Sequence, residues 1–103
     1  MGNLDFTKIE GFDWDDANLE HIKRHQVEAK ECEEVFFNKP LIVNSDETHS
    51  QVEERFRAYG QTDQNRVLFL IFTIRNNKIR VISARDQNKK ERIEYKEIGG
   101  VNL

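Results

Sequence analysis

The sequence predicts an α+β domain in which an antiparallel β-meander of about four strands follows two N-terminal helices and precedes one C-terminal helix. Two observations predict this class. Apolar residues recur at helical spacing before Pro40, and at alternating or continuous strand spacing after it. The strand segments then follow one another through short polar loops, as consecutive antiparallel strands do. Because the chain has 103 residues and a single proline, we expect one domain over residues 1–103.

The start of the chain carries few structural signals. Residues 1–10 are predicted to be loosely ordered, and the folded core is expected to cover residues 12–96. Phe12 to Trp14 is a candidate short strand. Both aromatic side chains stand where two elements meet, so we expect core packing rather than stacking on a nucleobase.

Two helices are predicted next. Asp15 is the expected N-cap of the first helix, which runs to about Arg24. The second helix is expected over residues 28–37 and ends before Pro40. It presents a single apolar helix face, which consists of Ala29, Cys32, Val35 and Phe36.

Four strands are predicted in the rest of the chain, at residues 41–43, 51–59, 66–75 and 78–85. In the second strand Phe56 and Ala58 alternate with charged residues, which indicates one buried and one exposed face. The third strand is apolar on both faces, as a central strand is. A two-residue turn at Asn76-Asn77 precedes the last strand. A charged final helix is expected over residues 88–96, with Asp86 as its cap.

Charge is divided unevenly along the chain, whose formal net charge is −3. Residues 1–54 hold 14 acidic and 5 basic side chains, a net charge of −9. Residues 55–103 hold 5 acidic and 11 basic side chains, a net charge of +6. This asymmetry indicates a basic working surface on the later strands. An equally weighted alternative is that the two sets of charges neutralise each other in the folded chain.

Composition favours a reducing compartment. The single cysteine, Cys32, excludes an internal disulfide and lies on the apolar face of the second predicted helix, where core packing is its expected role. Met1–Glu10 lacks the apolar stretch of a secretory signal, and Val67–Phe72 is too short to cross a bilayer. We therefore expect a cytoplasmic protein.

Arginine outnumbers lysine on the predicted strands, and its planar guanidinium binds phosphate through two hydrogen bonds. Such side chains suit a phosphate chain better than a small neutral substrate, and we expect them to converge on one patch. Metal-independent cleavage of RNA requires a base, an acid and cations around the phosphorus atom. Glu53 or Glu54 is a candidate base, and His25 a candidate acid or base. The candidate cations are Arg55, Arg75, Arg80 and Arg85.

Plainer interpretations compete with these assignments. Each arginine is equally well explained by an ion pair with the acidic half of the chain. His21 and His25 lie four residues apart on one helix face, a spacing found in zinc sites, but no third ligand is evident. We predict neither a metal nor a cofactor. The acidic residues of segment 28–34 indicate a solvated helix face or, alternatively, a surface for a basic partner.

An ordered series of motifs resembles the BrnT family over nearly the whole chain. The motifs are Phe12-Asp13-Trp14-Asp15, Asn18-Leu19-Glu20-His21-Ile22, Arg24-His25-Gln26-Val27, Glu33-Glu34-Val35-Phe36, Glu54-Arg55, Gly60, Arg80-Val81-Ile82-Ser83-Ala84-Arg85, Lys90-Glu91-Arg92 and Tyr95. The Ile-Ser-Ala-Arg strand followed by Lys-Glu-Arg is the most specific part. One departure is Gln26, where the family usually has glycine; if that glycine takes a positive φ, Gln26 strains or reshapes the turn between the helices.

The resemblance implies a RelE-like fold and a bacterial ribonuclease toxin that blocks translation. It also implies a cognate antitoxin with a ribbon-helix-helix DNA-binding region, which neutralises the toxin and represses their shared operon. DNA is then contacted only through the antitoxin, and a heterotetramer is one expected assembly. The catalytic residues implied by motif match are His25, Glu54, Arg55, Arg80 and Arg85. The candidate RNA-binding residues are Arg92 by resemblance and, by charge and position, Arg57, Arg75 and Lys89.

Two functions stay open at this point. The first is a metal-independent endoribonuclease that cleaves mRNA, inhibits translation and is neutralised by its antitoxin. The second is a catalytically degenerate toxin-like protein that acts only as an antitoxin-binding corepressor module. A small DNA-binding regulator is disfavoured, because the helix predicted over residues 28–37 is acidic rather than a basic recognition helix.

Overall fold

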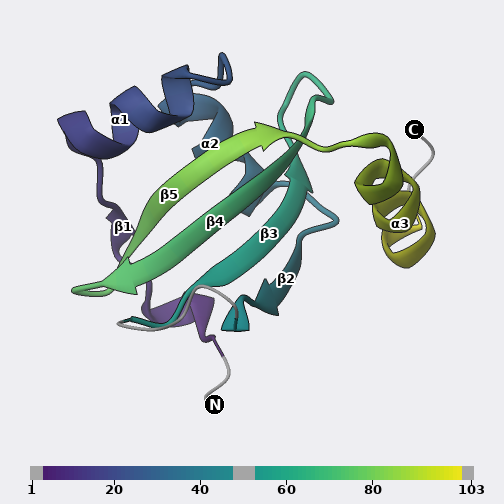
Figure 1. Cartoon of the computed structure of the whole chain (residues 1–103). Coiled ribbons are helices and arrows are strands. Elements are labelled where there is room, and N and C mark those ends of the chain that lie inside the picture. The colour runs from purple at the N-terminus through teal and green to yellow at the C-terminus, as the bar shows by residue number, and fades with distance from the viewer. Residues whose placement is uncertain (1–3, 48–52, 101–103) are drawn as a thin grey trace.

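The computed structural model of the chain describes residues 4–47 and 53–100 (Figure 1). Five strands form one sheet in the order β1-β5-β4-β3-β2. Helices α1 and α2 cover one face of this sheet, and α3 stands beyond one end of it (Figure 1). The elements in chain order are η1 (Phe6–Lys8), β1 (Gly11–Phe12), α1 (Asp16–Lys23), α2 (Ala29–Phe37), β2 (Ile42–Ser45), β3 (Phe56–Gln61), β4 (Val67–Arg75), β5 (Lys78–Asp86) and α3 (Lys89–Gly99).

The α+β class is confirmed, but the predicted four-stranded antiparallel sheet is wrong in detail. Strands β2 to β5 are antiparallel neighbours. Strand β1 adds a fifth, parallel to β5, by pairing with Lys78 and Ile79, so the sheet is mixed. A short 3₁₀ helix, η1, also precedes the two N-terminal helices. A two-residue strand has no periodicity of its own, and the sequence pattern therefore could not reveal its partner.

Side-chain caps fix where the helices begin. At α1 the predicted cap is confirmed: the Asp15 carboxylate accepts a hydrogen bond from the Asn18 amide at 3.2 Å, and the Asn18 side chain accepts one from the Asp15 amide at 2.8 Å. At α3 the predicted cap is wrong. Asp86 is still the last residue of β5, and Asn88 caps the helix by accepting from the Glu91 amide at 2.9 Å.

Several turns use the left-handed backbone region, and two of them were singled out by the sequence. Asn76 and Asn77 have φ of 51° and 63° in the β4–β5 hairpin, as expected of a two-residue turn. Gln26, between α1 and α2, has φ of 54°, which a residue other than glycine adopts at a cost. Arg66 of the β3–β4 connection holds this turn, because its Nη1 donates to the Gln26 carbonyl at 2.8 Å.

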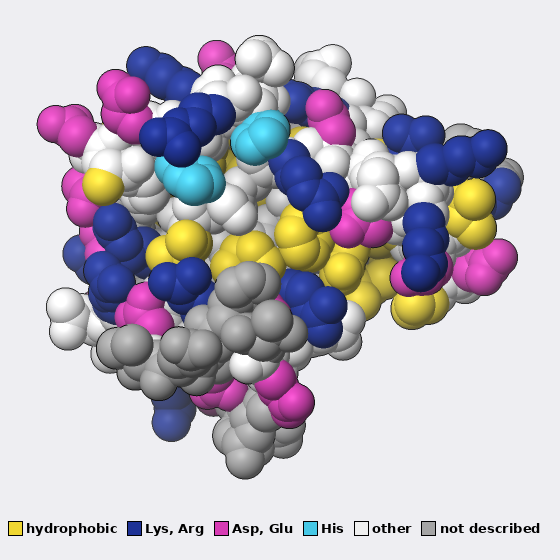
Figure 2. All heavy atoms as spheres, in the orientation of Figure 1, with side chains coloured by type: hydrophobic (Ala, Val, Ile, Leu, Met, Phe, Trp, Pro, Cys, Tyr) yellow, Lys and Arg dark blue, Asp and Glu magenta, His cyan; other side chains and the backbone are white. Residues whose placement is uncertain are grey.

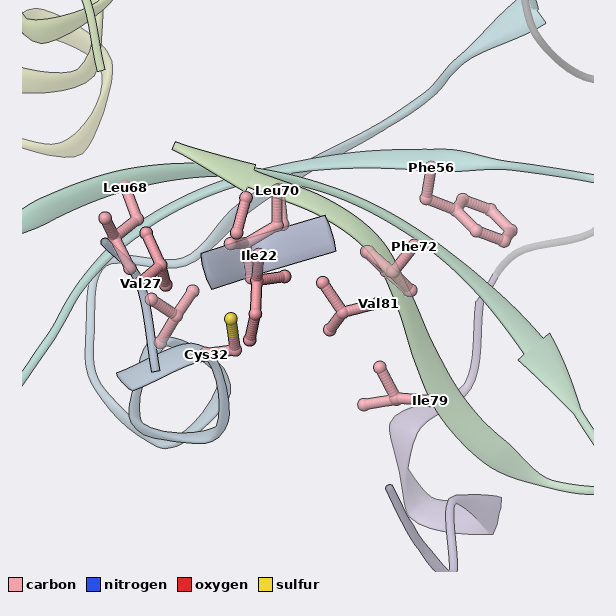
Figure 3. Close-up of a cluster of buried hydrophobic side chains, with 12 residues drawn as sticks. Ile22, Val27, Cys32, Phe56, Leu68, Leu70, Phe72, Ile79 and Val81 are labelled. Carbon is pink, nitrogen blue, oxygen red and sulfur yellow. The ribbon is translucent and has the colours of Figure 1, made fainter. Parts of the chain in front are cut away.

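The hydrophobic core lies between α1, α2 and the covered face of the sheet (Figure 3). Cys32 is fully buried there, and burial raises the pKa of its thiol to about 12, consistent with the packing role expected for it. Phe12 and Trp14 pack against the cluster, as predicted, and so do Leu4 and Ile9 of the N-terminal segment. The fully or almost fully buried members include Ile22, Val27, Val35, Leu68, Leu70, Phe72 and Val81.

Helix α3 is attached through the residues around its N-terminal end and through one buried ring. Tyr95 is almost fully buried, and its hydroxyl donates to the Pro40 carbonyl at 2.6 Å. Just before the helix, the buried Gln87 side chain donates to the Leu68 carbonyl at 3.0 Å. Of the described residues, no helix is long and apolar enough to cross a membrane.

Candidate RNA-binding face

The uncovered face of the sheet carries three rows of side chains that pair across its strands. Figure 2 shows hydrophobic side chains along the middle of this face, with Lys and Arg side chains on both sides of them. We name each row by its arginine. The Arg80 row is Thr73 and Arg80, the Arg57 row is Asn44, Arg57, Ile71 and Ser83, and the Arg85 row is Ile42, Tyr59, Phe69 and Arg85.

A β-bulge puts Arg80 and Arg85 on the same face. Arg80 and Arg85 are five positions apart along the chain. Because this number is odd, their side chains would point to opposite faces of a regular strand. The register of β5 shifts between Ser83, which pairs with Ile71, and Val81, which pairs with Phe72, so that Ile82 is the extra residue. The bulge thereby restores Arg85 to the face that Arg80 occupies.

The expected convergence of all the arginines on one patch is wrong. Along β4 the partner of Arg80 is Thr73 and the partner of Arg85 is Phe69. Four residues of strand separate these partners, which corresponds to about 13 Å. The Arg57 row lies midway between them. The candidate arginines therefore spread along the length of the face, with different surroundings at its two ends.

At one end Arg80 is enclosed by carboxylates. Its side chain is only 10% exposed, and its Nη1 lies 3.0 Å from Asp15 Oδ2 and 3.6 Å from Asp13 Oδ2. Nη2 donates a further hydrogen bond to Asp15 Oδ1 at 3.2 Å. This hydrogen bond holds the pKa of Asp15 below its ordinary value. Both acids belong to the acidic half of the chain, so the ion-pair interpretation describes Arg80 well.

The same end holds a second ion pair. Arg75 donates from Nε to Glu53 Oε2 at 3.2 Å and from Nη2 to Oε1 at 3.1 Å, and these bonds lower the pKa of Glu53. Arg55 Nη2 lies 4.0 Å from the same carboxylate. The neighbouring Glu54 is exposed, and its backbone carbonyl accepts a hydrogen bond from Thr73 Oγ1 at 2.7 Å. Three arginines and their carboxylates thus compensate one another here.

Arg57, in the middle of the face, is placed differently. In the part of the chain that the structure describes, no carboxylate forms an ion pair with it. Its Nη2 makes one long hydrogen bond to the Ser45 carbonyl at 3.4 Å. Its Nε is buried and has no hydrogen-bond partner. A half-buried guanidinium with an unsatisfied donor is a strong candidate for binding an anion.

The Arg85 row combines a cation with two aromatic rings. The Arg85 guanidinium lies over the Phe69 ring, 4.4 Å from its centroid, and the Tyr59 ring lies 5.1 Å from Phe69 on the other side. Glu91 at the start of α3 binds Arg85 through two hydrogen bonds, of 2.8 and 3.1 Å. The sequence did not single out Tyr59, Phe69 or Glu91, although the alternation of Tyr59 with Arg57 was a usable signal.

Beyond the Arg85 row lie the remaining predicted residues. His25 is exposed in the turn after α1, and Lys89 and Arg92 are exposed on α3. Asp86 lies close to two of these residues. Hydrogen bonds from Arg66 lower the pKa of Asp86 most, and the positive charges of Arg92 and His25 lower it further. The Arg66–Asp86 bond is 2.7 Å long. Three basic side chains therefore surround the Asp86 carboxylate: Arg66, Arg92 and His25.

The two candidate proton-transfer residues lie at opposite ends of the face. Glu54 is bonded to Thr73 near the end of β4, whereas the His25 carbonyl is bonded to Arg66 just before β4 begins. Arg66 and Thr73 are seven positions apart, which corresponds to about 23 Å of extended strand. Glu54 and His25 are therefore anchored near opposite ends of β4. Within residues 4–47 and 53–100, no three His, Cys, Asp or Glu side chains are grouped to hold a metal ion.

Comparison with known proteins identifies the matched region. Residues 14–91 match the model of a family described as ribonuclease toxin, BrnT, of type II toxin-antitoxin system. The match covers α1 through the first turn of α3 and includes all three rows of the open face. A search of the curated proteins found no significant match.

Proposed function

The chain belongs to the BrnT family of ribonuclease toxins of type II toxin–antitoxin systems, and we propose that it is an endoribonuclease that cleaves mRNA and so inhibits translation. Membership of a type II system implies a protein antitoxin as partner. We propose further that this antitoxin carries a ribbon-helix-helix DNA-binding region, that the two proteins assemble as a heterotetramer, and that both act in the cytoplasm.

Arg57 carries the proposal for where RNA binds. It sits in the centre of the open face, is only half-buried, and forms no ion pair with a carboxylate of the described residues. Its charge is therefore available to a phosphate group, whose geometry the planar guanidinium matches. A strand of RNA laid along the face from Arg57 toward α3 passes the Arg85 row and then reaches the basic residues Lys89 and Arg92.

Proton transfer is assigned to His25. Cleavage without a metal proceeds by attack of the 2′-oxygen on phosphorus and departure of the 5′-oxygen, so one proton leaves the hydroxyl and another reaches the leaving group. Imidazole is the side chain that exchanges protons near neutral pH, and His25 is exposed near Asp86, Arg66 and Arg92. We propose that His25 carries out one of the two transfers and that water completes the other. Arg55, Arg75, Arg80 and Glu54 belong to the other end of the face, around Thr73, and we propose that they stabilise that end.

The decisive experiment pairs toxicity with cleavage. The wild type, Arg57→Ala and His25→Ala are induced in bacteria without antitoxin, and each purified protein is incubated with single-stranded RNA in the presence of EDTA. Lys30→Ala is the matched control, since Lys30 is exposed on α2, on the opposite side of the sheet. The wild type and the control are expected to arrest growth and cleave RNA, and the two site variants to do both much more weakly. An inactive wild type would contradict the proposal.

The degenerate-toxin alternative is favoured by the compensated charges at the Arg80 end. Arg75 and Arg80 are both held by carboxylates, which leaves them little charge to offer a substrate. In that case the wild type is harmless and leaves RNA intact, yet still binds the antitoxin and strengthens its repression of the operon. A reporter fused to the operon promoter, measured with and without the chain, separates the two functions.

A further inference from the structure

The hydrogen bonds of Arg85 use the edge of its guanidinium rather than its plane. Nη1 donates to Glu91 Oε1 at 2.8 Å and to the Asp86 carbonyl at 3.1 Å, and Nη2 donates to Glu91 Oε2 at 3.1 Å. Three of the five N–H groups are therefore used within the protein. Glu91 is itself fixed, because its Oε1 also accepts the Asn88 amide at 2.9 Å in the capping box of α3.

An aromatic ring lies on one side of the same guanidinium, and part of the side chain stays exposed to solvent. Phe69 covers the inner face at 4.4 Å, and Phe69 is supported on its far side by Tyr59. The Arg85 side chain nevertheless stays 37% exposed. The side of the guanidinium that faces away from Phe69 is therefore where a further planar group could approach it. Arg85 is thus a flat cation held in a fixed orientation beside Arg57, in the next row of the sheet.

We propose that Arg85 forms a nucleobase subsite, in which an unpaired base of single-stranded RNA stacks on the outer face of the guanidinium. The inference rests on the proposed function and adds the form of substrate that the site takes. Guanidinium planes are established stacking partners for splayed-out bases, and every base has a face that can stack. A base in a duplex is already stacked on its neighbours and cannot occupy this position, so the subsite selects single strands.

The test separates base stacking from phosphate binding. Binding of a fluorescently labelled 2′-O-methyl oligonucleotide, which lacks the attacking hydroxyl, is compared with binding of an abasic oligomer that has the same number of phosphates. The variant is Arg85→Lys, which keeps the charge and the reach to Glu91 but has no plane. Phe69→Leu, which removes the ring under the guanidinium, is the second variant, and circular dichroism checks that both fold.

The wild type is expected to bind the base-bearing oligomer about tenfold more tightly than the abasic one. Both variants should lose most of this preference while their affinity for the abasic oligomer stays within about twofold of the wild type. The inference is overturned if the variants lose the same affinity for both oligomers, or if the wild type binds the base-bearing oligomer no more tightly than the abasic one. Cleavage of unmodified RNA by the same samples decides the proposed function separately.

Discussion

The two ends of the open face use the same interaction, an arginine paired with carboxylates, for opposite results. At the Arg80 end, Asp13 and Asp15 enclose the guanidinium and leave its side chain 10% exposed. In the Arg85 row, Glu91 binds only the edge of the guanidinium, which stays 37% exposed above an aromatic ring. The ion pairs of Arg80 therefore make it inaccessible to a ligand, whereas the ion pair of Arg85 holds it in a fixed orientation and leaves it accessible. Whether an arginine is available depends on the direction from which its acid approaches.

The largest expected effect tests which end holds the proton-transfer group. His25→Ala should lower the rate of RNA cleavage by about 100-fold or more, because general acid–base catalysis contributes at least that much. Its affinity for a non-cleavable RNA should not change. Glu54→Gln is the matched variant at the other end, and it should cleave at nearly the wild-type rate. Single-turnover cleavage measures both. The reverse result would move the active end to Glu54 and Arg80.

The second prediction compares two arginines. Arg57 pairs with no carboxylate among the described residues, whereas Arg75 pairs with Glu53. Arg57→Ala should weaken binding of non-cleavable RNA by about tenfold or more, the loss of one charge-assisted contact to phosphate. Arg75→Ala removes the same number of atoms and the same charge, but its guanidinium is already held by Glu53. Its affinity should change by less than about threefold. Equal losses in the two variants would mean that the face binds RNA through net charge alone.

The sequence predicted much of the fold and only part of the site, for a definite physical reason. Periodicity and turn residues revealed both N-terminal helices and the four longer strands, because those signals are local. The side of the sheet on which Arg85 lies depends on the bulge at Ile82, and the loss of Arg80 to ion pairs depends on the parallel pairing of β1 with β5. Both are properties of strand pairing, to which no local pattern in the sequence corresponds.

A third, smaller effect concerns stability at the Arg80 end. Arg80→Ala should lower the free energy of unfolding by about 1 kcal/mol, since it removes charge-assisted bonds to acids that are themselves partly exposed. RNA affinity should be retained. Urea denaturation of this variant beside Lys30→Ala measures the difference. If Arg80→Ala instead abolished RNA binding and left stability intact, the division of the face into a structural and a binding end would be wrong.

The smallest expected effect is a loss of folding stability at acid pH, and it also arises from ion pairs at the Arg80 end. Hydrogen bonds from Arg80 and Arg75 depress the folded-state pKa values of Asp15 and Glu53 below the ordinary values of 3.8 and 4.5. Their stabilising contribution is therefore complete above those ordinary values and is lost as the pH falls through the depressed ones. Urea midpoints measured between neutral pH and about pH 3 should decline less steeply for Arg80→Ala than for the wild type. Arg57→Ala removes an arginine that pairs with no acid among the described residues, so its curve should run parallel to the wild type. A flattened curve for Arg57→Ala would show that the central arginine is compensated too.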